Sequence, residues 1–341
     1  MISLYRTRFT LALLAFALLA AACGDSTSAE PSLAEPNSNP AEGGATTEAP
    51  AATEAPAPST TEAPAAFPVT ISASNGDIEL PAMPTRIVSM SATHTEMLFA
   101  IGAGDQVVAV DAFSNYPADA PVTDLTGFAP NVEAIVGFET DLVVTDGDWD
   151  GTSMGALTEL GVPVLILPAA QTLDDVYTQI EQLGVATGHV AEAAELVGNM
   201  QSDVAAVFDS LPENAEALTF YHELDNTYYS VTSETFIGQI YAQMGLVNIA
   251  DAVGEGSFGY PQLAEEYILE QDPDLILLAD TICCGMSTET LAERPGWDAL
   301  TAVGRGSVVE LNDDVASRWG PRVVDLMQAV ADAIAVVQVE A

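Results

Sequence analysis

Apolar residues recur at every third or fourth position over residues 189–211, and the rest of the chain is organised around this stretch. They are Val190, Ala194, Val197, Met200, Val204, Val207 or Phe208, and Leu211. This spacing predicts an amphipathic helix with one continuous apolar stripe. At about 1.5 Å per residue the helix would be roughly 35 Å long. One helix of this length between two similar stretches predicts two lobes with a cleft between them.

Short apolar runs on both sides of this helix predict parallel strands that are covered on both faces. In the first lobe they span residues 86–90, 107–110, 141–145 and 162–167, and in the second lobe residues 218–222, 275–279 and 308–311. Helices are expected at residues 97–101, from Thr172 to near Gly184, and at residues 235–244, 263–270 and 321–336. The predicted fold class is therefore α/β, with two lobes that contain mostly parallel sheets. Ligands of such sheets bind beyond the carboxyl ends of the strands.

The beginning of the chain has the composition of an export signal. Residues 1–10 carry Arg6 and Arg8 and no acid, and residues 11–22 are wholly apolar. This predicts a signal peptide over residues 1–22, too short to span a membrane comfortably. Residues 19–24, LAAACG, resemble a bacterial lipoprotein processing site, which implies that Cys23 carries a lipid. An ordinary cleaved signal with an incidental cysteine is the alternative.

Residues 23–66 form a separate segment of biased composition. Alanine, proline, threonine and glutamate dominate it, with ATTEAPA, ATEAPA and STTEAPA in succession. A segment with so little to bury is expected to be a disordered tether. The remaining boundaries are then residues 67–188 for the first lobe, 189–211 for the linking helix and 212–341 for the second lobe.

The charge of the chain excludes several partners. It has no lysine, seven arginines and 50 acids, for a formal net charge of −43. Nucleic acid and anionic membrane surfaces should repel such a protein. Because the acids are scattered along the sequence, they predict a solvated surface rather than a binding site.

Five blocks resemble, in order, the extracytoplasmic binding proteins of ABC importers for ferric siderophores, haem and cobalamin. They are PTRIVSMSATHTEMLFAIGAGDQVVAVDAFSNYP, NVEAIVGFETDLVVT, LGVPVLILPAAQTLDDVYTQIEQLGVATG, SFGYPQLAEEYILEQDPDLILLAD and RPGWDALTAVGRGSVVEL. The resemblance covers roughly residues 84–336. It implies two Rossmann-like lobes joined by one long helix and little movement on binding. It also implies a monomer that docks on a permease dimer with its ATPase, at the outer face of the cytoplasmic membrane.

The resemblance assigns one docking glutamate to each lobe. The matching positions are Glu133 in NVEAI and Glu266 in QLAEEYI, with Glu265 as the neighbouring alternative. In the family these carboxylates meet arginine pockets of the permease. Charge-assisted hydrogen bonds of this kind orient a complex and steer its formation. A solvated surface acid is the plain alternative at each position.

Candidate ligand contacts cluster in the loops that follow the predicted strands. His94 lies between the first strand and its helix, and His222 ends a strand of the second lobe, followed by Glu223, Tyr228 and Tyr229. Histidine with carboxylate and phenol oxygens could complete the shell of a ferric or cobalt centre. The alternative in each case is a turn histidine whose hydrogen bonds are satisfied within the protein.

Aromatic residues in polar loops could wall a large flat ligand. These candidates are Phe128, Trp149, Phe258, Tyr260 and Trp319, whereas Trp297 fits a core position.

Arg318 and a cysteine pair complete the candidates. Arg318 lies in a predicted cleft loop and would pair either with a ligand anion or with Asp313 or Asp314. The scarcity of basic residues favours a neutral or cationic chelate, such as a hydroxamate complex or a corrinoid.

Cys283 and Cys284 are adjacent, so a disulfide between them would be strained. We expect a vicinal disulfide there, with a thiolate pair for a soft metal as the alternative.

Two other function classes are weighed against the binding protein. Residues 151–155 match the G-x-S-x-G pattern of serine hydrolases, with Ser153 as the nucleophile. However, Ser153 does not directly follow a strand. A receptor for a free metal ion would need three or four histidine or acid ligands, and the chain has three histidines. We therefore expect a binding protein for a ferric-siderophore or corrinoid chelate, with no catalytic residue and no cofactor.

Overall fold

The computed structural model describes residues 66–212 and 217–340. The predicted signal peptide, the predicted lipid attachment at Cys23 and residues 23–65 of the predicted tether lie outside the described residues. Within them, the strands form a two-stranded antiparallel sheet and two four-stranded parallel sheets. No helix in this described part is long and apolar enough to cross a membrane.

The first lobe is built on the parallel sheet β4-β3-β5-β6. Its elements are β3 (Ile87–Ser89), α1 (Ala92–Ala100), η1 (Ala103–Gln106), β4 (Val107–Val110), α2 (Val132–Gly137), β5 (Leu142–Thr145), α3 (Ser153–Glu159), β6 (Val164–Ile166) and α4 (Leu173–Thr187). A hairpin, β1 (Val69–Ala73) and β2 (Gly76–Leu80), precedes them. The Asn75 side chain fixes the hairpin turn to β6 through Val164 O and Ile166 N.

The second lobe repeats this plan on the parallel sheet β10-β9-β7-β8. Its elements are β7 (Thr219–Glu223), α6 (Phe236–Gln243), β8 (Val247–Asn248), η2 (Ile249–Val253), α7 (Glu265–Gln271), β9 (Leu275–Leu278), α8 (Thr288–Ala292), η3 (Trp297–Ala299), α9 (Thr301–Arg305), β10 (Val308–Glu310), α10 (Asp313–Ser317) and α11 (Val323–Glu340). The predicted α/β fold with two lobes of parallel sheet is confirmed.

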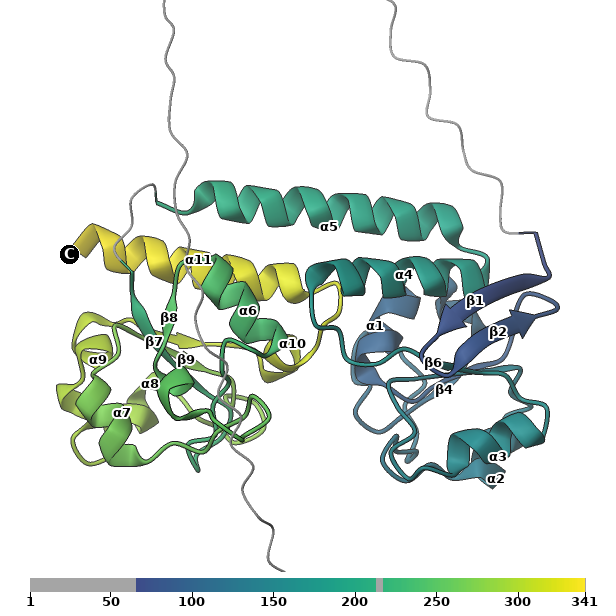
Figure 1. Ribbon diagram of the computed structural model, residues 1–341, viewed down its shortest axis with the longest axis horizontal. Helices are drawn as coiled ribbons and strands as arrows, with labels where there is room; N and C mark the ends of the chain where they lie inside the picture. The colour runs from purple at the N-terminus through teal and green to yellow at the C-terminus, as the bar shows by residue number, and fades with distance from the viewer. Residues whose placement is uncertain (1–65, 213–216, 341) are drawn as a thin grey trace, which may run out of the picture. The chain divides into compact units, whose positions relative to one another are not determined.

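The long helix α5 spans Val190–Ser210, with His189 and Leu211 as its caps. It starts directly after α4, because Gly188 breaks the helix with a φ of +79°. Its buried stripe is Ala193, Val197, Met200, Val204 and Val207. Ala194, which we assigned to the stripe, is exposed. Figure 1 shows α5 alongside α4 and α11, and it contacts both.

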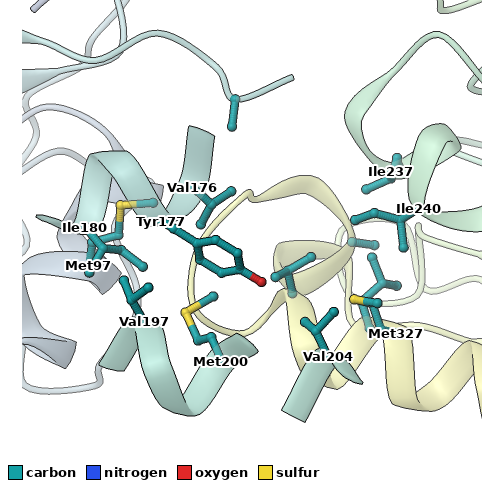
Figure 2. Close-up of a cluster of buried hydrophobic side chains, with 14 of the residues drawn as sticks. Met97, Val176, Tyr177, Ile180, Val197, Met200, Val204, Ile237, Ile240 and Met327 are labelled. Atoms are coloured by element: carbon teal, nitrogen blue, oxygen red, sulfur yellow. The ribbon is translucent and has the colours of Figure 1, made fainter. Parts of the chain in front are cut away.

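A single hydrophobic cluster continues from the first lobe into the second. Figure 2 shows part of it, with α4 and α5 supplying side chains in the middle. The labelled members are Met97, Val176, Tyr177, Ile180, Val197, Met200, Val204, Ile237, Ile240 and Met327. Residues of α1, α6 and α11 therefore share one core with the linking helix, and this shared core favours a fixed relation between the lobes.

Candidate functional site

Two adjoining hollows lie at the carboxyl ends of the parallel strands. The first has a volume of about 360 Å³ and is formed by residues that follow β3, β4 and β5. The second has a volume of about 450 Å³ and is formed by residues after β6 and β7, the start of α6 and residues 258–260. The segment 317–319, after α10, lines both hollows. We call the two hollows together the cleft.

Exposed aromatic side chains wall the cleft. In the first hollow they are Phe113, Phe128 and Trp149, and in the second Phe258 and Tyr260. All five are more than half exposed, and Phe258 reaches 97%. Phe128 and Trp149 pack together with ring centroids 5.9 Å apart, and Trp149 Nε1 donates to Asp146 Oδ1 at 2.9 Å. Exposed rings held in this way offer a preformed apolar surface to a ligand.

Trp319 lines both hollows, as expected for a ligand wall, but it is partly buried. Its indole Nε1 donates to Gln179 Oε1 at 3.1 Å. Its ring meets His94 edge to face, with centroids 6.2 Å apart. Trp319 is thereby held in place by α4 and α1.

The two histidines, which were candidate ligand contacts, are not among the residues that line the cleft. His94 lies in α1 with no exposed surface, behind Trp319, and its Nε2 is 3.3 Å from Gln179 Oε1. His222 lies in β7 with no exposed surface, and its Nδ1 is 3.3 Å from the Tyr241 hydroxyl. Burial lowers the pKa of His94 to about 4 and that of His222 to about 3. Both rings are therefore neutral at physiological pH.

The residues expected to assist His222 have other partners. Glu223 is fully buried, and both of its oxygens accept from Arg294, at 2.6 and 2.7 Å. Tyr228 stacks on Trp297, which is fully buried as predicted. In the described chain, no group of three or more His, Cys, Asp or Glu side chains is placed to hold a metal ion. Direct metal ligation by this part of the second lobe is thus unsupported.

Arg318 makes the intramolecular ion pair that was one of its two expected roles. Its guanidinium donates to Asp314 Oδ1 at 2.7 Å and to Glu96 Oε1 at 2.7 Å. It also donates to Phe113 O and Asn115 Oδ1, each at 3.0 Å. Arg322 donates from Nε to the other oxygen of Glu96 at 2.8 Å. Glu96 of α1 therefore ties the segment between α10 and α11 to the first lobe.

The docking candidates occupy matching places in the two lobes. Glu133 lies in the first turn of α2 and Glu266 in the first turn of α7, and both are exposed. Glu265, the neighbouring alternative, accepts a hydrogen bond from Trp297 Nε1 at 3.0 Å. Glu266 is therefore the more accessible carboxylate of the two.

Cys283 and Cys284 are exposed free thiols in this structure. They follow β9, and the Cys283 backbone N–H donates to Asp313 Oδ2 at 2.6 Å. Partial desolvation, the neighbouring Cys284 thiol and the Asp313 carboxylate raise the pKa of Cys283 to about 12. The vicinal disulfide stays a prediction, which thiol titration of the purified chain would test.

Ser153 is not arranged as a nucleophile. It is the first residue of α3, and its Oγ donates to Asp150 Oδ2 and lies 3.4 Å from Pro130 O. No histidine is among its hydrogen-bond partners in the described chain.

Sequence reasoning missed three acids near the cleft. Asp111 and Asp146 each directly follow a strand and line the first hollow, and Glu96 lies behind it in α1. The position of the two aspartates after apolar runs was a usable signal. The partners of Glu96 lie 222 and 226 residues away in sequence, and no local pattern indicates such contacts.

Comparison with known proteins agrees with this architecture. A family model described as periplasmic binding protein matches residues 87–315. A cobalamin-binding protein of Halobacterium salinarum is 34% identical over 278 residues, covering 79% of this chain and 74% of that protein. An uncharacterized ABC transporter substrate-binding lipoprotein of Bacillus subtilis is 29% identical over 277 residues, covering 79% of this chain and 86% of that protein.

Solved structures share the fold. The periplasmic vitamin B12-binding protein of Vibrio cholerae has a TM-score of 0.61 at 24% identity, covering 75% of this chain and 99% of that one. A protein of an Fe3+-hydroxamate transport system from Saccharomonospora viridis has a TM-score of 0.61 at 25% identity, covering 79% of this chain and 99% of that one. This chain belongs to the periplasmic binding protein family.

Proposed function

We propose that this chain is a lipid-anchored receptor that captures a corrinoid outside the cytoplasmic membrane and delivers it to an ABC permease with its ATPase. The observation that carries the proposal is the cleft wall of five exposed aromatic side chains. A large ring system with apolar faces gains most from such a wall. The name of the Halobacterium relative supports the same ligand class.

A ferric hydroxamate is the second candidate ligand. The similar protein from the Fe3+-hydroxamate transport system of Saccharomonospora viridis supports it. The charge of the cleft suits both candidates, because Arg318 is the one basic side chain among its described lining residues and is already paired. A free metal ion fits less well, because the described residues present no group of ligands for it.

The lobes are expected to move little on binding. The lobes are connected through α5. In addition, Glu96 of the first lobe forms ion pairs with Arg318 and Arg322, which lie between α10 and α11. The shared core includes side chains of α4, α6 and α11, and α5 packs against both α4 and α11. A cleft already formed before binding requires little ordering when the ligand arrives.

We expect Phe128→Ala and Trp149→Ala each to weaken corrinoid binding about tenfold, since exposed aromatic anchors dominate such contacts. Isothermal titration of the whole chain with cyanocobalamin measures the change. Leu160→Ala removes a side chain that is 63% exposed at the end of α3, outside the cleft, and serves as the control. Unchanged affinity in both aromatic variants would show that the aromatic wall of the cleft is not part of the ligand-binding site.

The carboxylates of Glu133 and Glu266 are proposed to dock the permease, one from each lobe. Both are exposed and lie in the first turn of a helix of their own lobe. Neither makes a hydrogen bond or ion pair with the described residues that would compete with a permease arginine. Paired charges at two separated points would fix the orientation of the complex.

We expect the double charge reversal Glu133→Arg and Glu266→Arg to lower uptake about tenfold or more, because an arginine would repel the permease arginines. Uptake of radiolabelled ligand is compared with ligand affinity, which should not change. The control reverses two other exposed acids, Glu159 of α3 and Glu270 of α7. Equal uptake by the docking and control variants would show that the assignment is wrong.

A further inference from the structure

The first hollow of the cleft is acidic. Its lining includes three aspartates and one base, Arg318. Arg318 already donates to two carboxylates, one side-chain amide and one backbone carbonyl. Its side chain is only 10% exposed. The hollow therefore offers negative charge to a ligand and no free cation.

Asp111 is the most deeply buried of these acids. It directly follows β4, is 4% exposed and lines the hollow. Among the described residues, only Ser114 donates a hydrogen bond to its carboxyl. Burial raises the pKa of Asp111, and the negative charge of Asp146 raises it further, whereas Ser114 and Arg318 act against the rise. A buried carboxyl with one donor gains from a further donor or a positive charge.

Asp146 places a second carboxylate on the same hollow. It directly follows β5, and one of its oxygens accepts from the Trp149 indole. The rings of Trp149 and Phe128 stand beside it. Aromatic faces next to carboxylates attract a cationic group by two additive effects, the charge and the ring quadrupole.

Resting on the proposed function, we infer that Asp111 and Asp146 form a subsite for a positively charged or N–H-bearing group at the edge of the ligand. The cleft then selects among chelates of similar shape by charge. Chelates with peripheral amides or amines are accepted, and those with peripheral carboxylates are rejected. Arg318 does not reverse this preference, because Glu96 and Asp314 neutralise it.

Derivatives of one chelate that differ only in peripheral charge test the inference. Cyanocobalamin carries peripheral amides, its monocarboxylic acids replace one amide by a carboxylate, and aminoethyl amides of those acids carry an ammonium group instead. We expect the whole chain at pH 7 to bind at least one carboxylate isomer about tenfold more weakly than its aminoethyl amide. Asp111→Asn and Asp146→Asn should each reduce this ratio about fivefold. Asp119→Asn, an exposed site outside the cleft, should leave it unchanged.

A second series separates this inference from the proposed function. Ferrioxamine B has a free ammonium group, its N-acetyl derivative is neutral, and its N-succinyl derivative is anionic. If no corrinoid binds but the ferrioxamines bind in the order cationic, neutral, anionic, the corrinoid proposal fails and the acidic subsite stands. Equal affinity across a series that binds overturns the subsite, as does a ratio unchanged in both aspartate variants. Absence of binding in both series overturns it too. Thermal melting of each variant confirms that it is folded.

Discussion

Glu96→Gln is expected to lower the free energy of unfolding by about 3 kcal/mol, because removal of one partner leaves buried charges uncompensated. The Glu96 side chain is 2% exposed, and its oxygens accept from Arg318 and Arg322. Those arginine side chains are only 10% and 19% exposed, so water would replace the carboxylate poorly. In this variant Arg318 still forms its ion pair with Asp314. The expected loss of unfolding free energy therefore lies at the lower end of the range for broken buried ion pairs.

Urea unfolding of the whole chain measures this loss. Glu195→Gln on the exposed side of α5 makes the same chemical change without a buried partner, and its stability should equal that of the unaltered chain. A loss below about 1 kcal/mol in Glu96→Gln, typical of a surface ion pair, would contradict the role of Glu96 as the tie between distant segments.

Asp280→Asn is expected to stabilise the protein at pH 8 by about 3 kcal/mol. Asp280 is fully buried after β9, and neither of its oxygens accepts a hydrogen bond from a described residue. Burial, with the charge of Glu223, raises its pKa from 3.8 to about 7, although Arg294 opposes the rise. Glu223 uses both of its oxygens to bind Arg294, so this arginine compensates Asp280 incompletely.

The size of this stabilisation depends on pH. Between pH 4 and 7 the folded state keeps a proton on Asp280 that the unfolded state releases, because the folded-state pKa is the higher one. The contribution of Asp280 to the free energy of unfolding is therefore fully present below about pH 4. It is lost as the pH rises through 7 and the buried carboxyl ionises. Urea unfolding at pH 4, 6 and 8 should show the gain of Asp280→Asn growing with pH. Asp298→Asn, at an exposed position, is the control. A difference that does not change with pH would contradict the assignment.

The linking helix and the parallel strands could be predicted because their signals are local. The apolar period over residues 189–211 placed α5 within one residue at each end, and the run at residues 107–110 coincides with β4. The β1–β2 hairpin was missed, although an Asn-Gly turn signal, Asn75-Gly76, lies where β1 (Val69–Ala73) turns into β2 (Gly76–Leu80). The extra helical turns of the second lobe lack such periodicity.

The cleft could be predicted only in part, because a sequence position does not show which way a side chain points. Loop aromatics such as Phe128 and Trp149 are exposed, since polar neighbours keep them out of the core. The two histidines lie at the expected strand and helix ends but point into the protein. The role of Glu96 depends on partners more than 200 residues away, so it follows only from the folded chain.

The most direct test of the central claim is tryptophan fluorescence of the whole chain during titration with cobalamin, haem and ferric siderophores. Zinc and manganese ions are the controls. Trp149 and Trp319 line the cleft, whereas Trp297 is fully buried elsewhere. We predict saturable quenching by a corrinoid, smaller in Trp149→Phe because Trp319 remains in the cleft, and no response to the bare ions. Saturable binding of a bare ion with no response to any chelate would contradict the account.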